Sequence, residues 1–99
     1  MKAKTRIEAT WKPPGPAPPG RLSAAGKSLL PDTAFAFPHA RKEPMTDAAH
    51  VRDAMARFNQ VGDVTDGEKD LAFANIHKAA AHFDIQMKET NWRHDWPTP

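Results

Sequence analysis

The stretch FAFPHARKEPMTDAAHVR (residues 35–52) places two aromatic side chains, a basic patch and the start of a helix within a single short run. Pro38 and Pro44 interrupt it, and because proline fixes φ and lacks a backbone donor, the following helix must begin after Pro44. The residues between the prolines are mostly polar or charged. We therefore expect Phe35 and Phe37 to pack as an extended lid over a small core, while the basic patch faces solvent.

A first helix is expected downstream of this lid. Thr46 or Asp47 is a suitable N-cap, since a short polar side chain there accepts a hydrogen bond from an otherwise unpaired N–H group. Apolar residues then recur at the spacing of one helix face: Val51, Ala54, Met55, Phe58 and Val61.

A second helix is expected from Thr65 to about Phe83. Thr65 and Glu68 have the spacing of a capping box, and apolar residues recur at helical spacing from Phe73 onward. Only residues 60–64 separate the two helices, so they should lie antiparallel or steeply crossed. The sequence thus predicts a mainly α fold, a small helical hairpin closed by a Pro-rich, aromatic extended lid.

The size of the chain limits its core. With 99 residues, 39% of them hydrophobic, and ten prolines, it should form one small domain. Two helices alone bury little surface. We therefore expect Phe35, Phe37 and one or both of the C-terminal Trp92 and Trp96 to complete the core.

The N-terminal part differs in composition from the rest. Residues 1–31 hold six basic residues and one acidic residue, whereas residues 32–99 hold three more acidic than basic residues. The stretch KPPGPAPPGR (residues 12–21) cannot form a helix or a central strand and is typical of a polyproline-like spacer. We expect residues 1–28 to be a disordered basic leader and residues 29–96 to be the helical domain.

Several classes of protein are disfavoured by absent features. The chain has no cysteine, which removes disulfides, thiolate metal sites and a cysteine nucleophile and is typical of a reducing cytoplasm. It has no apolar run of about 20 residues and no apolar signal segment, so no membrane partner is expected. The GKS at residues 26–28 lacks the first glycine of a phosphate loop, since Arg21 stands at that position.

The run LPDTAFAFPHARKEPMTDAAHVRDAMARFNQV (residues 30–61), followed by the T-D-x-E helix start and a short DIQM stretch, resembles an uncharacterised family of small bacterial and phage-borne domains of unknown function. Related patterns are similar to tails attached to phage head-maturation protease or scaffold-like proteins. The resemblance covers roughly residues 30–88. It implies a compact, mostly helical module that accompanies other proteins in bacteria or their phages.

Catalytic chemistry has few candidates. The five histidines show no metal-binding motif, and Ser23 and Ser28 lie in the leader, where a nucleophile is poorly positioned. Asp47 and His50 form the best local pair, but the carboxylate is better explained as a helix cap. We therefore expect no enzyme activity, no cofactor and no bound metal. A metal-dependent enzyme using this pair is the least favoured alternative.

The leading hypothesis is a non-enzymatic interaction or accessory module that binds a protein partner. Its candidate partner-binding residues are Arg41, Lys42, Arg52 and Arg57, with pairing to nearby acidic residues as the alternative explanation for these charges. The second hypothesis is weak nucleic-acid binding through the leader. Its candidate residues are Lys2, Lys4, Arg6 and Lys12.

Overall fold

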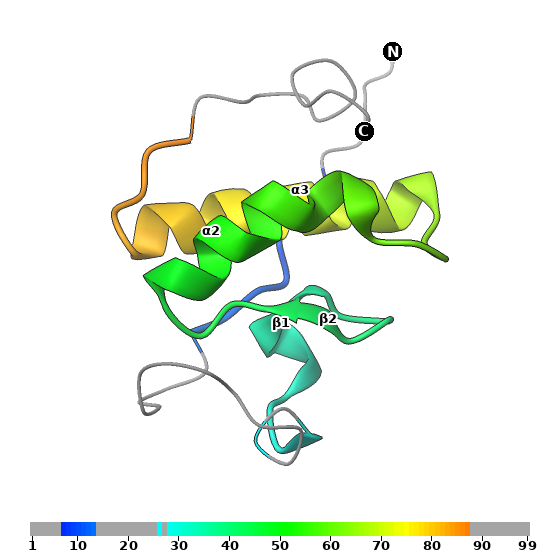
Figure 1. Cartoon of the computed structure of the whole chain (residues 1–99), viewed down its shortest axis with the longest axis horizontal. Helices are drawn as coiled ribbons and strands as arrows, with labels where there is room; N and C mark the ends of the chain where they lie inside the picture. The colour runs from blue at the N-terminus through cyan, green and yellow to red at the C-terminus, as the bar shows by residue number, and fades with distance from the viewer. Residues whose placement is uncertain (1–6, 14–25, 27, 88–99) are drawn as a thin grey trace.

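The computed structural model describes residues 7–13, 26 and 28–87. In this part of the chain a short 3-10 helix and a β-hairpin precede two α-helices (Figure 1). The elements in chain order are η1 (Asp32–Ala34), β1 (Phe35–Phe37), β2 (Lys42–Pro44), α2 (Ala48–Arg57), η2 (Phe58–Gln60) and α3 (Asp66–His82).

The segment expected to be an extended lid is an antiparallel two-stranded sheet. β1 pairs with β2 so that Phe35 lies opposite Pro44 and Phe37 lies opposite Lys42. The prediction of a mainly α fold, a helical hairpin under an extended lid, is therefore wrong: the protein has a small α/β fold. The two phenylalanines are nevertheless buried, as the lid hypothesis required.

The sheet was missed because neighbouring residues here have opposite structural preferences. The aromatic residues of β1 favour a strand, whereas the prolines on either side of residues 39–43 disfavour a central strand and led to the prediction of an extended lid. Pro44 is tolerated because a two-stranded sheet consists only of edge strands. Arg41 and Glu43 take positive φ values of 54° and 59°, which lets the chain turn and pair with β1. Strands of three residues are too short to show a period in the sequence.

Both predicted helices are confirmed, together with their caps. The side chain of Asp47 accepts a hydrogen bond from the backbone N–H of His50 at 2.8 Å and caps α2. Thr65 and Glu68 form the capping box of α3, with hydrogen bonds of 3.1 and 2.9 Å. Neither these helices nor any other in the described part of the chain is long and apolar enough to span a membrane.

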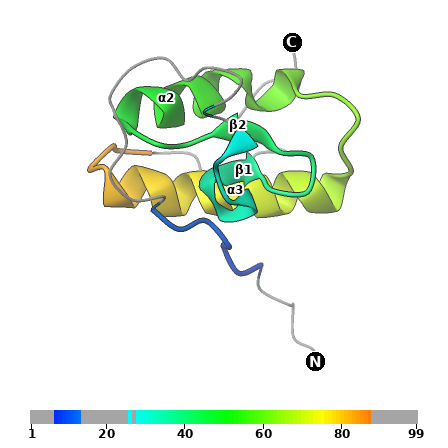
Figure 2. The ribbon, with the colours of Figure 1, turned by 90° about the horizontal axis from the view of Figure 1, so that it is seen from below.

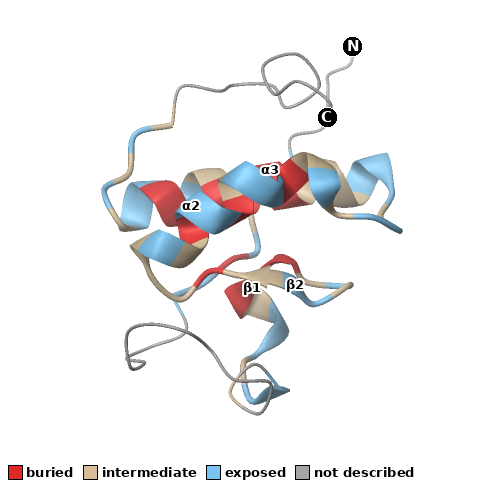
Figure 3. Cartoon of the chain, viewed as in Figure 1, coloured by how far each residue is buried: buried red, intermediate tan, exposed pale blue. Residues whose placement is uncertain are grey.

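The helices form one layer and the hairpin packs against one face of this layer (Figure 1). α2 and α3 run in opposite directions, and β1 packs against α3 (Figure 2). Buried residues line the sides of the helices and strands that face each other (Figure 3). The largest fully buried side chains are Trp11, Phe35, Phe37, Phe58, Met45, Ile76, Val51 and Asn75.

The N-terminal segment contributes to this core. Trp11 is completely buried, and the backbone N–H of Lys12 donates to the carbonyl oxygen of Thr33 at 3.1 Å. The packed part of the molecule therefore extends further toward the N-terminus than the boundary expected at Leu29. The weak alternation of polar and apolar residues up to Trp11 does not by itself place this side chain in the core. Trp92 and Trp96, the tryptophans expected there, lie outside the described residues.

Candidate functional site

Asp47 and His50, the pair with the best spacing for acid–base or metal chemistry, lie at the N-terminus of α2. The Oδ1 atom of Asp47 accepts the backbone N–H of His50 and also lies 2.7 Å from its ring nitrogen Nδ1. The hydroxyl oxygen of Thr46 is 3.5 Å from the same nitrogen. The carboxylate thus caps the helix, as predicted, and orients the imidazole ring.

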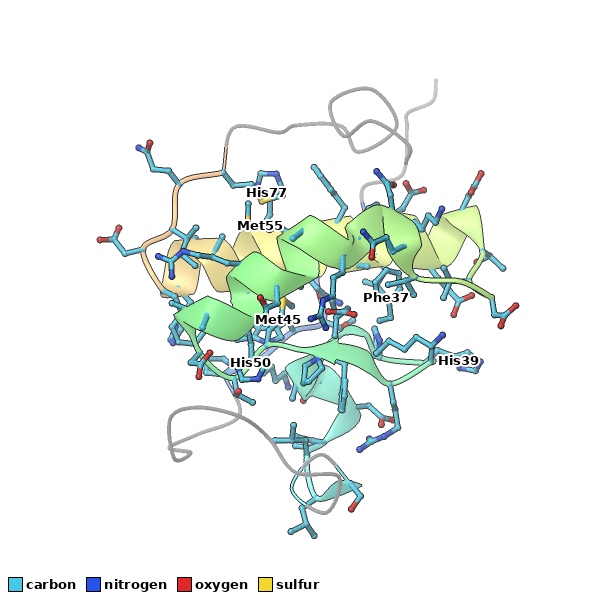
Figure 4. All side chains as sticks on the ribbon, viewed as in Figure 1. Phe37, His39, Met45, His50, Met55 and His77 are labelled. Atoms are coloured by element: carbon cyan, nitrogen blue, oxygen red, sulfur yellow. The ribbon has the colours of Figure 1, made fainter. Side chains whose placement is uncertain are left out.

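Three of the histidines that the structure describes lie apart from one another. His39 lies near the tip of the hairpin, His50 lies in the first turn of α2, and His77 lies on α3, so the three side chains do not converge (Figure 4). His77 packs edge-on against Phe73, with ring centroids 4.9 Å apart. Within the described residues, no group of three or more His, Cys, Asp or Glu side chains is arranged to hold a metal ion.

Among the predicted partner-binding residues, Arg41 is held by contacts within the molecule. Its guanidinium pairs with Asp32 at 2.5 Å and donates to the carbonyl oxygen of Leu30 at 3.0 Å. The same group lies 4.6 Å from the centroid of the Phe35 ring, in cation–π geometry. These contacts tie the segment before β1 to the hairpin, and they give Arg41 a structural role.

Lys42 and Arg57 come together at one surface hollow. This hollow, of about 260 Å³, lies between β2 and the end of α2 and is lined by Lys42, Glu43, Arg57, Gln60, Val61 and Gly62. The ammonium group of Lys42 donates to the carbonyl oxygen of Gly62 at 3.2 Å, which holds the lysine across the hollow. Arg57 is exposed, and Val61 is half-buried.

The remaining candidates lie elsewhere. Arg52 is exposed on α2 but does not line the hollow. Lys12 is exposed in the N-terminal segment. The other three nucleic-acid candidates, Lys2, Lys4 and Arg6, lie outside the described residues. The structure therefore joins two of the four partner-binding candidates into one site.

Asn75 is the polar residue that sequence reasoning missed. It is completely buried at the middle of α3, where its side chain makes hydrogen bonds to the N-terminal segment and to β1. The spacing of Asn75 in the sequence indicates that it is buried, because it lies three residues after Ala72 and four before Ala79, on the apolar face of its helix. A polar side chain buried there requires hydrogen-bond partners.

Comparison with known families places this geometry in context. Residues 22–90 match the model of a family of unknown function, DUF6582, and the chain belongs to that family. No curated protein matches the chain. No solved structure matches it either.

Proposed function

We propose that this member of the family is a non-enzymatic interaction module that binds a protein partner through the hollow between β2 and the end of α2. The observation that carries the proposal is that two basic residues, Lys42 and Arg57, line the same hollow although they are 15 residues apart in the sequence.

The chemistry of the hollow suits an acidic side chain of the partner. The guanidinium of Arg57 offers a planar set of donors that bind a carboxylate in a bidentate manner, and Lys42 adds a second positive charge. Val61 provides apolar surface beside them, and Glu43 reduces the net positive charge. A short partner segment with one carboxylate next to an apolar residue therefore fits better than a long polyanion.

The setting of this interaction is part of the same proposal. The absence of cysteine favours the cytoplasm, and the sequence pattern favours an accessory protein of a bacterium or its phage. The partner would then be another cytoplasmic protein of that system.

Weak nucleic-acid binding through the N-terminal arm is the second candidate. It is favoured by the excess of basic residues in residues 1–31 and by the exposed side chain of Lys12. Because residues 32–99 carry an excess of negative charge, the arm would have to supply the attraction by itself. Such binding would fall steeply as the salt concentration rises.

The test is affinity capture of the tagged full-length protein from its own host, with and without nuclease. We expect a partner that survives nuclease treatment and is lost from the double variant Lys42→Glu, Arg57→Glu. The matched control is Lys78→Glu, an exposed charge reversal on α3 that should leave the capture unchanged.

The opposite result would favour the second candidate. Capture that is abolished by nuclease, and by replacing Lys2, Lys4, Arg6 and Lys12 with alanine, but not by the Lys42 and Arg57 changes, would overturn the proposed function. A titration with mixed DNA and RNA fragments at low and high salt would then measure that binding directly.

A further inference from the structure

The N-terminal segment, residues 7–13, is held by the side chain of Asn75. The Oδ1 atom of Asn75 accepts the backbone N–H groups of Thr10 and Trp11 at 2.7 and 2.8 Å. Its amide group donates to the carbonyl oxygen of Ala36 in β1 at 2.9 Å. One buried side chain therefore binds two successive peptide groups of the segment and is itself fixed by the sheet.

Trp11 is the only side chain of the described segment that is completely buried. Its indole N–H donates to the carbonyl oxygen of Met45 at 3.2 Å. Its ring packs edge-on against His82 and Phe83, with centroids 5.5 and 5.9 Å away. The residues around Trp11 thus contact both the apolar ring and the polar N–H of the tryptophan, two features that together distinguish this residue type.

The flanking residues are held mostly by their backbone. Lys12 donates its N–H to Thr33, and the hydroxyl of Thr10 also accepts a hydrogen bond from the amide group of Asn75 at 3.3 Å. Thr10 and Lys12 are nevertheless exposed residues, and Ile7 is 47% exposed. Backbone hydrogen bonds combined with one deep side-chain pocket are how proteins recognise extended peptides, since the first give affinity and the second gives specificity.

The residues that contact the N-terminal segment belong to a different part of the chain from the segment itself. These contacting residues, which run from Thr33 to Phe83 and are called the groove below, all lie within the family match at residues 22–90. Residues 7–13 lie outside the match. Residues 14–21, with four prolines, connect the two parts. The family domain therefore supplies the groove and a separate sequence supplies what fills it.

We infer that the groove formed by Thr33, Ala36, Met45, Asn75, His82 and Phe83 is a peptide-binding site for an extended segment with a tryptophan in the position of Trp11. Residues 7–13 are its resident, exchangeable ligand. A partner protein with such a segment would compete with the chain's own. This site has a different lining from the Lys42 and Arg57 hollow, and the inference does not depend on the function proposed for that hollow.

Covalent attachment favours the resident segment. A short linker keeps a tethered ligand at an effective concentration in the millimolar range, so a free peptide of equal affinity would need a similar concentration to compete. Exchange should therefore become measurable at low peptide concentration once the linker is cut.

The experiment uses the full chain with residues 15–20 replaced by a specific protease site and cleaved after folding. The probe is a fluorescent peptide with the sequence of residues 5–13. We expect saturable binding in fluorescence anisotropy, together with release of the cleaved leader. The Trp11→Ala peptide should bind at least about 30-fold more weakly, as expected for a buried aromatic anchor.

The matched control is the peptide with Lys12→Ala, which retains the backbone N–H that bonds to Thr33 and changes only an exposed side chain. It should bind as tightly as the natural sequence. Failure of the natural peptide to exchange would overturn the inference. So would loss of the α-helical circular dichroism signal when the leader is released, because residues 7–13 would then be an integral part of the core.

Discussion

Asn75 holds Trp11 by a hydrogen bond of 2.8 Å from the backbone N–H to the side-chain oxygen, across 64 residues of sequence. The same oxygen accepts the N–H of Thr10, and the amide group of Asn75 donates to Ala36. A single side chain in α3 thereby connects the N-terminal segment to the first strand of the hairpin.

Replacing this side chain should be costly. Asn75→Ala should lower the free energy of unfolding by roughly 2–4 kcal/mol, because it removes the partner of the buried N–H of Trp11, of the part-buried N–H of Thr10 and of the carbonyl oxygen of Ala36. Urea denaturation followed by circular dichroism measures the loss. Lys78→Ala, an exposed change on the same helix, should stay within about 0.5 kcal/mol of wild type. A similar stability for both variants would show that water satisfies these groups equally well.

The packing of the hairpin on the helices gives a second prediction. Phe37 and Phe58 are buried and their ring centroids are 5.9 Å apart. Phe37→Ala and Phe58→Ala should each cost about 3 kcal/mol, because each loses transfer free energy and leaves a cavity. Since the rings are neighbours, the double variant should not show the sum of the two losses.

Thermal and urea unfolding of the three variants test this coupling. Arg52→Ala, on the exposed side of α2, is the matched control and should leave stability nearly unchanged. If both phenylalanine variants were as stable as this control, the FAF segment would be a binding surface and not part of the core.

The capping box of α3 gives a pH prediction. The backbone N–H of Thr65 donates to Glu68 and, aided by the Thr65 hydroxyl, holds the pKa of that carboxyl below its ordinary value against partial desolvation. A carboxyl group with a lower pKa in the folded state stabilises the fold at pH values above its ordinary, unfolded-state pKa. This stabilisation is lost as the pH falls from the ordinary pKa through the lowered one. The stability of the wild type relative to Glu68→Gln should therefore decrease on acidification.

Unfolding free energies of both proteins between about pH 6 and about pH 3 measure this difference, because the ordinary pKa of glutamate lies within that range. Thr65→Ala should cost about 1 kcal/mol at neutral pH through loss of the cap. A difference between wild type and Glu68→Gln that does not change with pH would contradict the role given to the carboxylate.

The C-terminal end of α3 offers a stabilising change. Asp84 has a φ of 60°, and the N–H of Ile85 donates to the carbonyl oxygen of Ala80 at 2.7 Å, the arrangement that closes a helix with a left-handed residue. Glycine adopts this φ without the steric cost of a Cβ atom. Asp84→Gly should therefore raise the melting temperature, by roughly 0.5 kcal/mol in free energy, since part of the gain is lost to the more flexible unfolded chain.

Lys78→Gly is the matched comparison, because it introduces the same residue inside α3. It should lower stability by somewhat less than about 1 kcal/mol, as glycine does in a helix interior. Opposite signs for the two glycine variants support the assignment of Asp84 as the left-handed cap; equal losses would contradict it.

Local features of this protein were determined by the sequence itself. The caps at Asp47 and Thr65 connect residues three apart, and the apolar spacing after each cap defines which side of the helix is buried. Interactions over so short a range are encoded in neighbouring residue types, so the two helices and the burial of Phe37 and Phe58 could be predicted.

The tertiary structure decided the rest. Whether residues around Pro38 and Pro44 form a lid or a hairpin depends on pairing between short strands that have no sequence period. The burial of Trp11 depends on Asn75, 64 residues away, and the hollow depends on Lys42 meeting Arg57. These arrangements form only when distant elements pack together, because the free energy that fixes them comes from contacts that no local stretch of the chain contains.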